Sequence, residues 1–140
     1  MTAAPVEVGD WTKEAKSFSP AMTAEVAAAA EPALEAVAAG LSAEGYRIRD
    51  RTSTGFRASH RKLIQGILGL VTGNDADILD RTLLSVTTAA AGSGTLLTIS
   101  VEGGGQHSAG ILRGTAGLTA GLQDLQRRGI CVTTTPWRKA

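Results

Sequence analysis

The apolar residues between positions 21 and 44 recur with the period of an amphipathic helix. Four of them share one helical face, at i, i+3, i+4 and i+7: Leu34, Val37, Ala38 and Leu41. Gly45 follows as a C-terminal stop. Because proline is tolerated best in a first helical turn, Pro32 indicates either a helix that begins near Glu31 or a longer helix that kinks there.

Residues 46–60 change to a period of two around a polar, glycine-bearing turn, which predicts a β-hairpin. One face of this hairpin takes Tyr46, Ile48, Phe56 and Ala58, and the other takes Arg47, Arg49 and Arg57. A second alternating pair, residues 78–89 and 95–101, predicts another hairpin. Its inward positions are Leu84, Val86, Leu97, Ile99 and Val101. The apolar stretch 62–73 contains two internal glycines and favours neither helix nor strand.

A second amphipathic helix is predicted near the C-terminus, with Ser108 as its N-cap and Gly129 as its end. Its apolar stripe consists of Ile111, Leu118, Leu122 and Leu125. The neighbouring stripe consists of four glycines, at i, i+4, i+7 and i+11: Gly110, Gly114, Gly117 and Gly121. Each glycine inside a helix costs roughly 0.5 to 1 kcal/mol relative to alanine. The stripe therefore predicts a close backbone approach, either to the chain's own sheet or to a second copy.

The predicted order is helix, hairpin, apolar connection, hairpin, helix and a short strand over residues 130–135. It predicts an α+β two-layer sandwich, in which an antiparallel sheet of four to five strands carries two helices on one face. The expected boundaries are an N-terminal arm (1–20), a single domain (21–135) and a basic tail (136–140). Trp11 in the arm and Trp137 in the tail are either lids on the core or anchors for another chain.

Four segments resemble small uncharacterised bacterial domains built as helix, four strands and helix, which in turn resemble half of a TATA-binding-protein-like layer. The segments are residues 33–41, Gly45-Tyr46-Arg47-Ile48, Arg51-Thr52 and Gly55-Phe56-Arg57-Ala58. The resemblance covers about residues 30–128. It implies the same layered fold and no reaction or catalytic residue. The basic first hairpin and the glycine stripe have no counterpart in that pattern.

Composition limits the classes of function. Lys and Arg together number 14 and Asp and Glu 13, so the net charge of +1 gives no global attraction to nucleic acid or anionic membranes. Cys131 is the single cysteine, which excludes an intramolecular disulfide and a thiolate metal cage within one chain. The first twenty residues lack a secretory pattern and no segment is apolar enough to cross a bilayer, so we expect a cytoplasmic protein.

Charge is nevertheless unevenly distributed. Residues 46–62 contain six basic residues and one acidic residue, whereas residues 1–45 contain seven acidic residues and two basic ones. The candidate residues for binding an anion or a partner are Arg47, Arg49, Arg57, Arg61 and Lys62. They form either a solvated sheet face or a site for an acidic partner, for which the acidic N-terminal region of a second copy is one candidate. The absence of aromatic stacking residues argues against nucleic acid. Peripheral membrane contact through residues 62–73 is a further alternative.

No complete catalytic set is recognisable. The residues around Ser108 approach a nucleophile elbow, but Gln106 replaces the first glycine and no histidine follows the serine. Glycines precede this predicted helix and suit an anion, but no phosphate-binding motif is complete. His60 and His107 have no partner at metal-ligand spacing. We therefore expect no catalytic, metal-binding or cofactor-binding residue.

These observations favour a non-catalytic module that binds another protein or a second copy of itself. The candidate self-association residues are the four glycines of the stripe together with Trp11 and Trp137. The alternative is a domain that binds an anionic small molecule or a membrane surface through the basic hairpin. A small enzyme is the third hypothesis.

Overall fold

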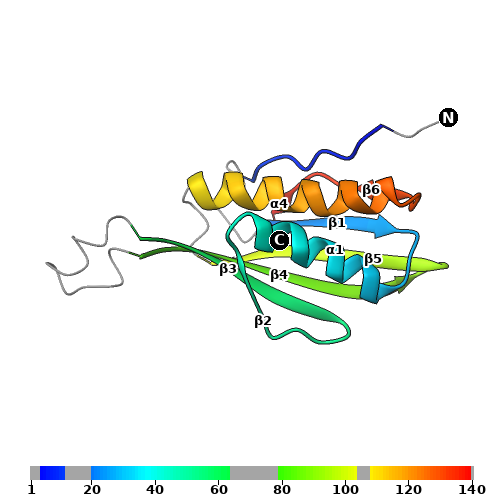
Figure 1. Ribbon diagram of the computed structural model, residues 1–140, viewed down its shortest axis with the longest axis horizontal. Coiled ribbons are helices and arrows are strands. Elements are labelled where there is room, and N and C mark those ends of the chain that lie inside the picture. Colours follow the sequence, from blue (N-terminus) through cyan, green and yellow to red (C-terminus); the bar gives the residue numbers. More distant parts are fainter. Residues whose placement is uncertain (1–3, 12–19, 64–78, 104–107, 140) are drawn as a thin grey trace, which may run out of the picture.

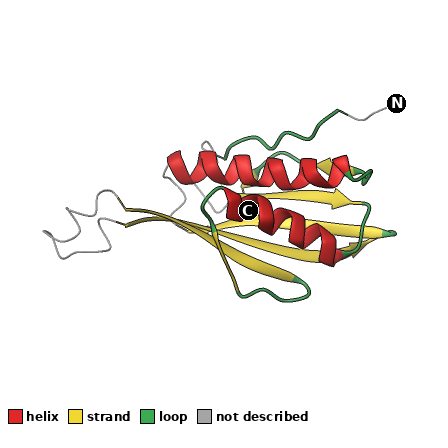
Figure 2. Cartoon of the chain, in the orientation of Figure 1, coloured by secondary structure: helices red, strands yellow, loops and turns green. Residues whose placement is uncertain are grey.

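The computed structural model describes residues 4–11, 20–63, 79–103 and 108–139. Within these residues the chain forms one sheet with both helices on the same side (Figures 1 and 2). The elements are β1 (Pro20–Val26), α1 (Ala30–Ala43), β2 (Arg47–Arg49), β3 (Gly55–Leu63), β4 (Leu79–Ala91), β5 (Gly94–Gly103), α4 (Ser108–Arg127), β6 (Val132–Thr134) and β7 (Arg138–Lys139). The predicted α+β two-layer sandwich is confirmed.

All strand pairings in the sheet are antiparallel, and the strands lie in the order β2-β3-β4-β5-β1-β6, with β7 also paired to β1. The two predicted hairpins are β2–β3 and β4–β5. The positions predicted to face inward are buried in both hairpins, apart from half-buried Ile48. The sheet is wider than predicted, because β1 and the short β7 add strands that the alternation of residues 46–101 does not include.

β1 corrects the prediction for the Ala-rich run that starts at residue 21. Met22, Ala24 and Val26 are buried in alternation with more exposed neighbours, which is the period of a strand. β1 lies between β5 and β6 and bonds to both, so its backbone is satisfied by partners distant in sequence. The helix begins only at Ala30, which places Pro32 in the first turn and confirms the shorter of the two predicted helices.

The C-terminal half of the glycine stripe of α4, Gly117 and Gly121, faces α1. A Cβ at Gly121 would stand 2.7 Å from the Ala36 carbonyl oxygen, and one at Gly117 would stand 2.9 Å from the Gly40 carbonyl oxygen. The two helix backbones therefore touch, with Gly40 of α1 completing the contact. The close approach is confirmed, but for Gly117 and Gly121 the surface approached is the other helix, because both helices share one side of the sheet. Gly110 is the glycine of the stripe that meets the sheet, at Thr82 of β4.

The N-terminal segment, residues 4–11, is not a free arm. It runs along α4 on the side away from α1 (Figure 1), with Val6 and Val8 buried. Polar side chains of α4 bond to its backbone: the Val6 and Val8 amides donate to Gln126 Oε1 (2.8 Å) and Thr119 Oγ1 (3.1 Å). Gln123 Nε2 donates to the Val6 carbonyl at 2.9 Å. Thr119, Gln123 and Gln126 stand at i, i+4 and i+7, so one helical face supplies all three contacts.

Trp11 and Trp137 hold the N-terminal segment against the C-terminal residues. The ring centroids of Trp11 and Trp137 lie 4.9 Å apart at an interplanar angle of 54°. Trp11 is fully buried and Trp137 is 7% exposed, and Trp137 Nε1 donates to the Gly9 carbonyl at 2.6 Å. The expected basic tail is therefore part of the fold, since Trp137 packs in the core and β7 pairs with β1.

Candidate partner-binding face

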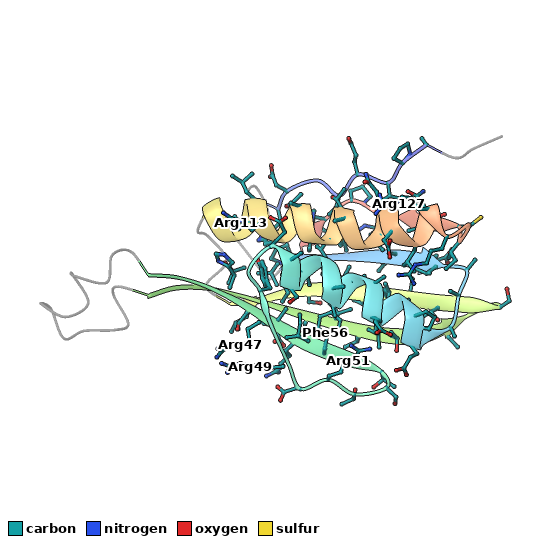
Figure 3. The ribbon with its side chains drawn as sticks, viewed as in Figure 1. Arg47, Arg49, Arg51, Phe56, Arg113 and Arg127 are labelled. Carbon is teal, nitrogen blue, oxygen red and sulfur yellow. The ribbon has the colours of Figure 1, made fainter. Side chains whose placement is uncertain are left out.

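Three arginines lie on the side of the sheet that no described helix covers. Arg49 is paired directly with Arg57 across β2 and β3, and Arg47 stands two residues before Arg49 on the same side. All three side chains are exposed, while Ile48 and its partner Ala58 point to the core. We call Arg47, Arg49 and Arg57 the arginine cluster; Figure 3 shows Arg47 and Arg49 at the outer edge of the sheet, away from the helices.

The strand register extends this cluster into rows of small polar residues. One row runs through Arg49, Arg57, Ser85, Ser100 and Ala21, from β2 across to β1. The next row contains three threonines, one each from β4, β5 and β1: Thr87, Thr98 and Thr23. Leu83 and Leu96 lie among these rows and are half-buried. We call this side of the sheet the bare face. Its arginines, serines and threonines are confirmed as the alternation predicts, whereas Leu83, Leu96, Glu25 and Glu102 on the same side were not predicted.

Only one member of the arginine cluster has an acidic partner among the described residues. Arg57 Nε lies 3.4 Å from Glu102 Oε2, which reaches it from β5 across β4. Both side chains are solvent-accessible, so this ion pair contributes little to stability. Arg47 and Arg49 form no ion pair or hydrogen bond with any described residue. Like charges directly opposite each other destabilise a sheet, and Glu102 offsets this repulsion between Arg49 and Arg57 only in part.

Arg61 and Lys62 lie farther along β3. Their backbones pair with those of Arg81 and Asp80 on β4, beyond the last β4–β5 pair at Leu83. Their side chains lie outside the described part of the molecule, and so do residues 64–73 of the stretch considered for membrane contact. Neither described helix has the length and apolarity that crossing a bilayer requires.

The predicted self-association residues are all buried within their own chain. Gly117 and Gly121 lie against α1, as described above. A Cβ at Gly114 would stand 2.6 Å from Trp11 Cη2 and 2.7 Å from Tyr46 Oη, and one at Gly110 would clash with the Thr82 side chain. Trp11 and Trp137 pack on each other, so they act as lids on the core. In this fold the chain itself occupies the surface that these six residues were expected to offer to a second copy.

Tyr46 of the first hairpin lies beside His60 and bonds to the start of α4. Tyr46 Oη donates a hydrogen bond of 2.7 Å to the Gly110 carbonyl oxygen, and the rings of Tyr46 and His60 lie 5.2 Å apart. Burial raises the pKa of the Tyr46 hydroxyl well above its ordinary value. The hydroxyl is therefore a neutral donor at physiological pH and cannot act as a base. The described residues contain no group of acidic, histidine or cysteine side chains that could hold a metal ion.

Replacing Tyr46 by phenylalanine tests this hydrogen bond. We expect the free energy of unfolding to fall by about 1 kcal/mol at neutral pH. The wild type should lose stability as the pH rises above about 10, because the unfolded tyrosine ionises there while the folded one stays neutral. The phenylalanine variant lacks this loss, so the difference between the two proteins should shrink in urea titrations at rising pH. A difference that stays constant up to about pH 11 would contradict the assignment.

Two shallow hollows lie on the described surface. One, of about 560 Å³, lies at the end of the sheet between Glu25, the β4–β5 turn and Cys131. The Cys131 thiol is exposed and forms no disulfide bond. The other, of about 380 Å³, lies between the N-terminal segment and Trp137. Neither hollow contains a member of the arginine cluster. Sequence reasoning missed both, because each is formed by segments far apart along the chain.

The residues of the serine and histidine hypotheses are described only in part. His107 and the Ser108 side chain lie outside them, and His60 faces the core beside Tyr46 rather than the bare face. The arginine cluster and the bare face are therefore the strongest candidate site. Comparisons with family models, with curated proteins and with solved structures returned no match to this chain.

Proposed function

We propose that this chain is a non-catalytic protein-binding module that receives an acidic protein surface on its bare face. The observation that carries the proposal is the pair of exposed arginines, Arg47 and Arg49, that have no partner among the described residues. A planar guanidinium group donates two parallel hydrogen bonds to a carboxylate, so each unpaired arginine provides a ready contact for Asp or Glu. The single cysteine favours the cytoplasm as the setting for this binding.

The composition of the bare face supports a protein partner over nucleic acid. Arginine is enriched at protein interfaces, and beyond the arginine cluster the face carries hydroxyls with the aliphatic Leu83 and Leu96, which a protein partner can cover. Glu25 and Glu102 lie on the same side, so the face is not the continuous basic stripe that is typical of nucleic-acid binding. The described residues of this face include no aromatic side chain on which a base would stack.

A labelled peptide of alternating glutamate and serine tests the proposal directly. We expect it to bind the full chain, and we expect Arg47→Gln/Arg49→Gln to weaken that binding about tenfold, because two charge-assisted hydrogen bonds are lost. The matched control is Arg113→Gln/Arg127→Gln, which removes the same charge from α4 and should change affinity less than about twofold. Fluorescence anisotropy at two salt concentrations measures all three proteins.

Two competitors define the outcomes that would reject a protein partner. Single-stranded DNA that binds more tightly than the peptide would assign the face to nucleic acid. Inorganic phosphate that displaces the peptide at low concentration would assign the arginines to a small anion. Binding of the peptide that the Arg47→Gln/Arg49→Gln variant leaves unchanged would remove the bare face from consideration.

A further inference from the structure

The two layers of the molecule carry charge of opposite sign. On the helix side, formed by residues 4–11, α1 and α4, the described carboxylates are Glu7, Asp10, Glu31, Glu35, Glu44 and Asp124, and the described arginines are Arg113, Arg127 and Arg128. On the bare face, the described arginines are Arg47, Arg49, Arg57 and Arg138, and the described carboxylates are Glu25 and Glu102. Acidic groups therefore predominate on one side and basic groups on the other.

The unpaired carboxylates of the helix side are concentrated on α1. Its exposed row consists of Glu31, Glu35, Ala39 and Ser42, at i, i+4, i+8 and i+11. Glu31 and Glu35 form no ion pair or hydrogen bond with any described residue, whereas Glu44 and Asp124 are paired with arginines of α4. The exposed row thus offers two carboxylates that have no partner in the described part of the chain, followed by two small residues.

The spacing of these carboxylates matches that of the arginine cluster. Residues four apart on a helix have Cβ atoms about 5 to 6 Å apart. Arg47 and Arg49 are two residues apart on a strand, about 7 Å, and Arg49 and Arg57 are directly opposite, about 5 Å apart. A helix carrying Glu31 and Glu35 can therefore form ion pairs with two arginines of the cluster at once.

The rest of the exposed row of α1 suits the rest of the bare face. Ala39 and Ser42 have short side chains, so they let the helix axis approach a flat surface closely. Beyond the arginine cluster the bare face offers the hydroxyl rows with half-buried Leu83 and Leu96. A second copy would cover those leucines with a helix, just as α1 and α4 cover the other side of the same sheet.

We propose that the acidic surface received by the bare face is the exposed row of α1 of a second copy of this chain. This inference rests on the proposed function and names its partner. Because the two surfaces differ and lie on opposite sides of the molecule, the contact is head-to-tail and each bound copy leaves one surface free. The association therefore extends into open chains of copies rather than stopping at a symmetric dimer.

Mixing two complementary variants of the full chain tests this head-to-tail contact. Arg47→Gln/Arg49→Gln removes the basic surface and keeps the acidic row, and Glu31→Gln/Glu35→Gln does the reverse. Light scattering and native mass spectrometry should find a mass that rises with concentration for the wild type and monomers for each variant alone. The mixture should form one-to-one pairs and nothing larger. All four substituted side chains are exposed, so circular dichroism should show both variants folded.

Salt and a control variant complete the design. The apparent dissociation constant of the wild type should rise at least about tenfold between about 0.05 and 0.5 M NaCl, because exposed charges are screened. Arg113→Gln/Arg127→Gln should assemble as the wild type does. A wild type that stays monomeric at every concentration, or a mixture that stays monomeric, would overturn the inference. So would dimers formed by either variant alone, since these indicate a symmetric contact.

The acidic peptide separates this inference from the proposed function. Peptide binding that depends on Arg47 and Arg49, together with a monomeric wild type, would leave the proposed function intact and reject the second copy as the partner. A peptide that does not bind, together with assembly that the Gln variants abolish, would show that the face recognises this chain alone. A peptide that does not bind, together with a wild type that stays monomeric, would reject both proposals.

Discussion

Replacing Gly121 by alanine is expected to lower the free energy of unfolding by about 2 to 3 kcal/mol, even though alanine is the better helix former by about 1 kcal/mol. The new Cβ would stand 2.7 Å from the Ala36 carbonyl oxygen and 2.8 Å from Val37 Cα. Both atoms belong to the backbone of α1, so no side chain can rotate away. The two helices must move apart, which loosens the contacts along their whole length.

Ala120→Gly is the matched control, because residue 120 is the exposed neighbour of Gly121 on α4. This substitution should lower the free energy of unfolding only by the difference in helix propensity, about 1 kcal/mol. Urea unfolding of the two variants measures both effects, and the larger loss should belong to Gly121→Ala. A Gly121→Ala protein more stable than the wild type would show that the helix backbones are not in contact.

Replacing Trp11 by alanine is expected to lower the free energy of unfolding by about 3 to 5 kcal/mol, which is the usual range for deleting a large buried aromatic side chain. The indole is fully buried and packs against the Trp137 ring at a tilted angle. Its loss leaves residues 4–8 held by the burial of Val6 and Val8 and by hydrogen bonds from three polar side chains of α4. We therefore expect the N-terminal segment to separate from α4, and limited proteolysis should cleave it before the rest of the chain.

Trp11→Phe distinguishes the packing of this ring from its polarity. Trp11 Nε1 is buried and has no hydrogen-bond partner among the described residues, so phenylalanine removes no bond and deletes an unsatisfied donor. We expect the free energy of unfolding to fall by about 1 to 2 kcal/mol, which is well below the fall expected for Trp11→Ala. Equal losses for the two variants in urea unfolding would indicate that the indole nitrogen is bonded in solution.

The arginine cluster shows how far local pattern alone locates a candidate site. Alternation along residues 46–60 placed Arg47, Arg49 and Arg57 on one side and Tyr46 and Phe56 on the other, and the structure confirms that division. It succeeds because successive side chains of a strand point to opposite faces whatever the rest of the chain does. The partner of Arg57 could not be predicted, since Glu102 reaches it from a strand 45 residues away.

β1 and the N-terminal segment show where local pattern fails. The Ala-rich run from residue 21 has a high helix propensity, yet its first part becomes a strand because β5 and β6 bond to it on both sides. Residues 4–11 have no period that marks them as part of the core. They are buried because α4 presents three polar side chains to their backbone and the Trp11 indole packs against Trp137.

The sequence by itself determined the layered class, the two hairpins with their inward faces, the C-terminal helix and the arginines on the outer side of the sheet. Each of these depends on periodicity within a single element, which nearest neighbours set. Only the tertiary structure decided which surface the glycines approach, that Trp11 and Trp137 meet and that Arg47 and Arg49 have no ion-pair or hydrogen-bond partner among the described residues. These features depend on segments up to about 130 residues apart, whose contacts form only when the whole chain packs.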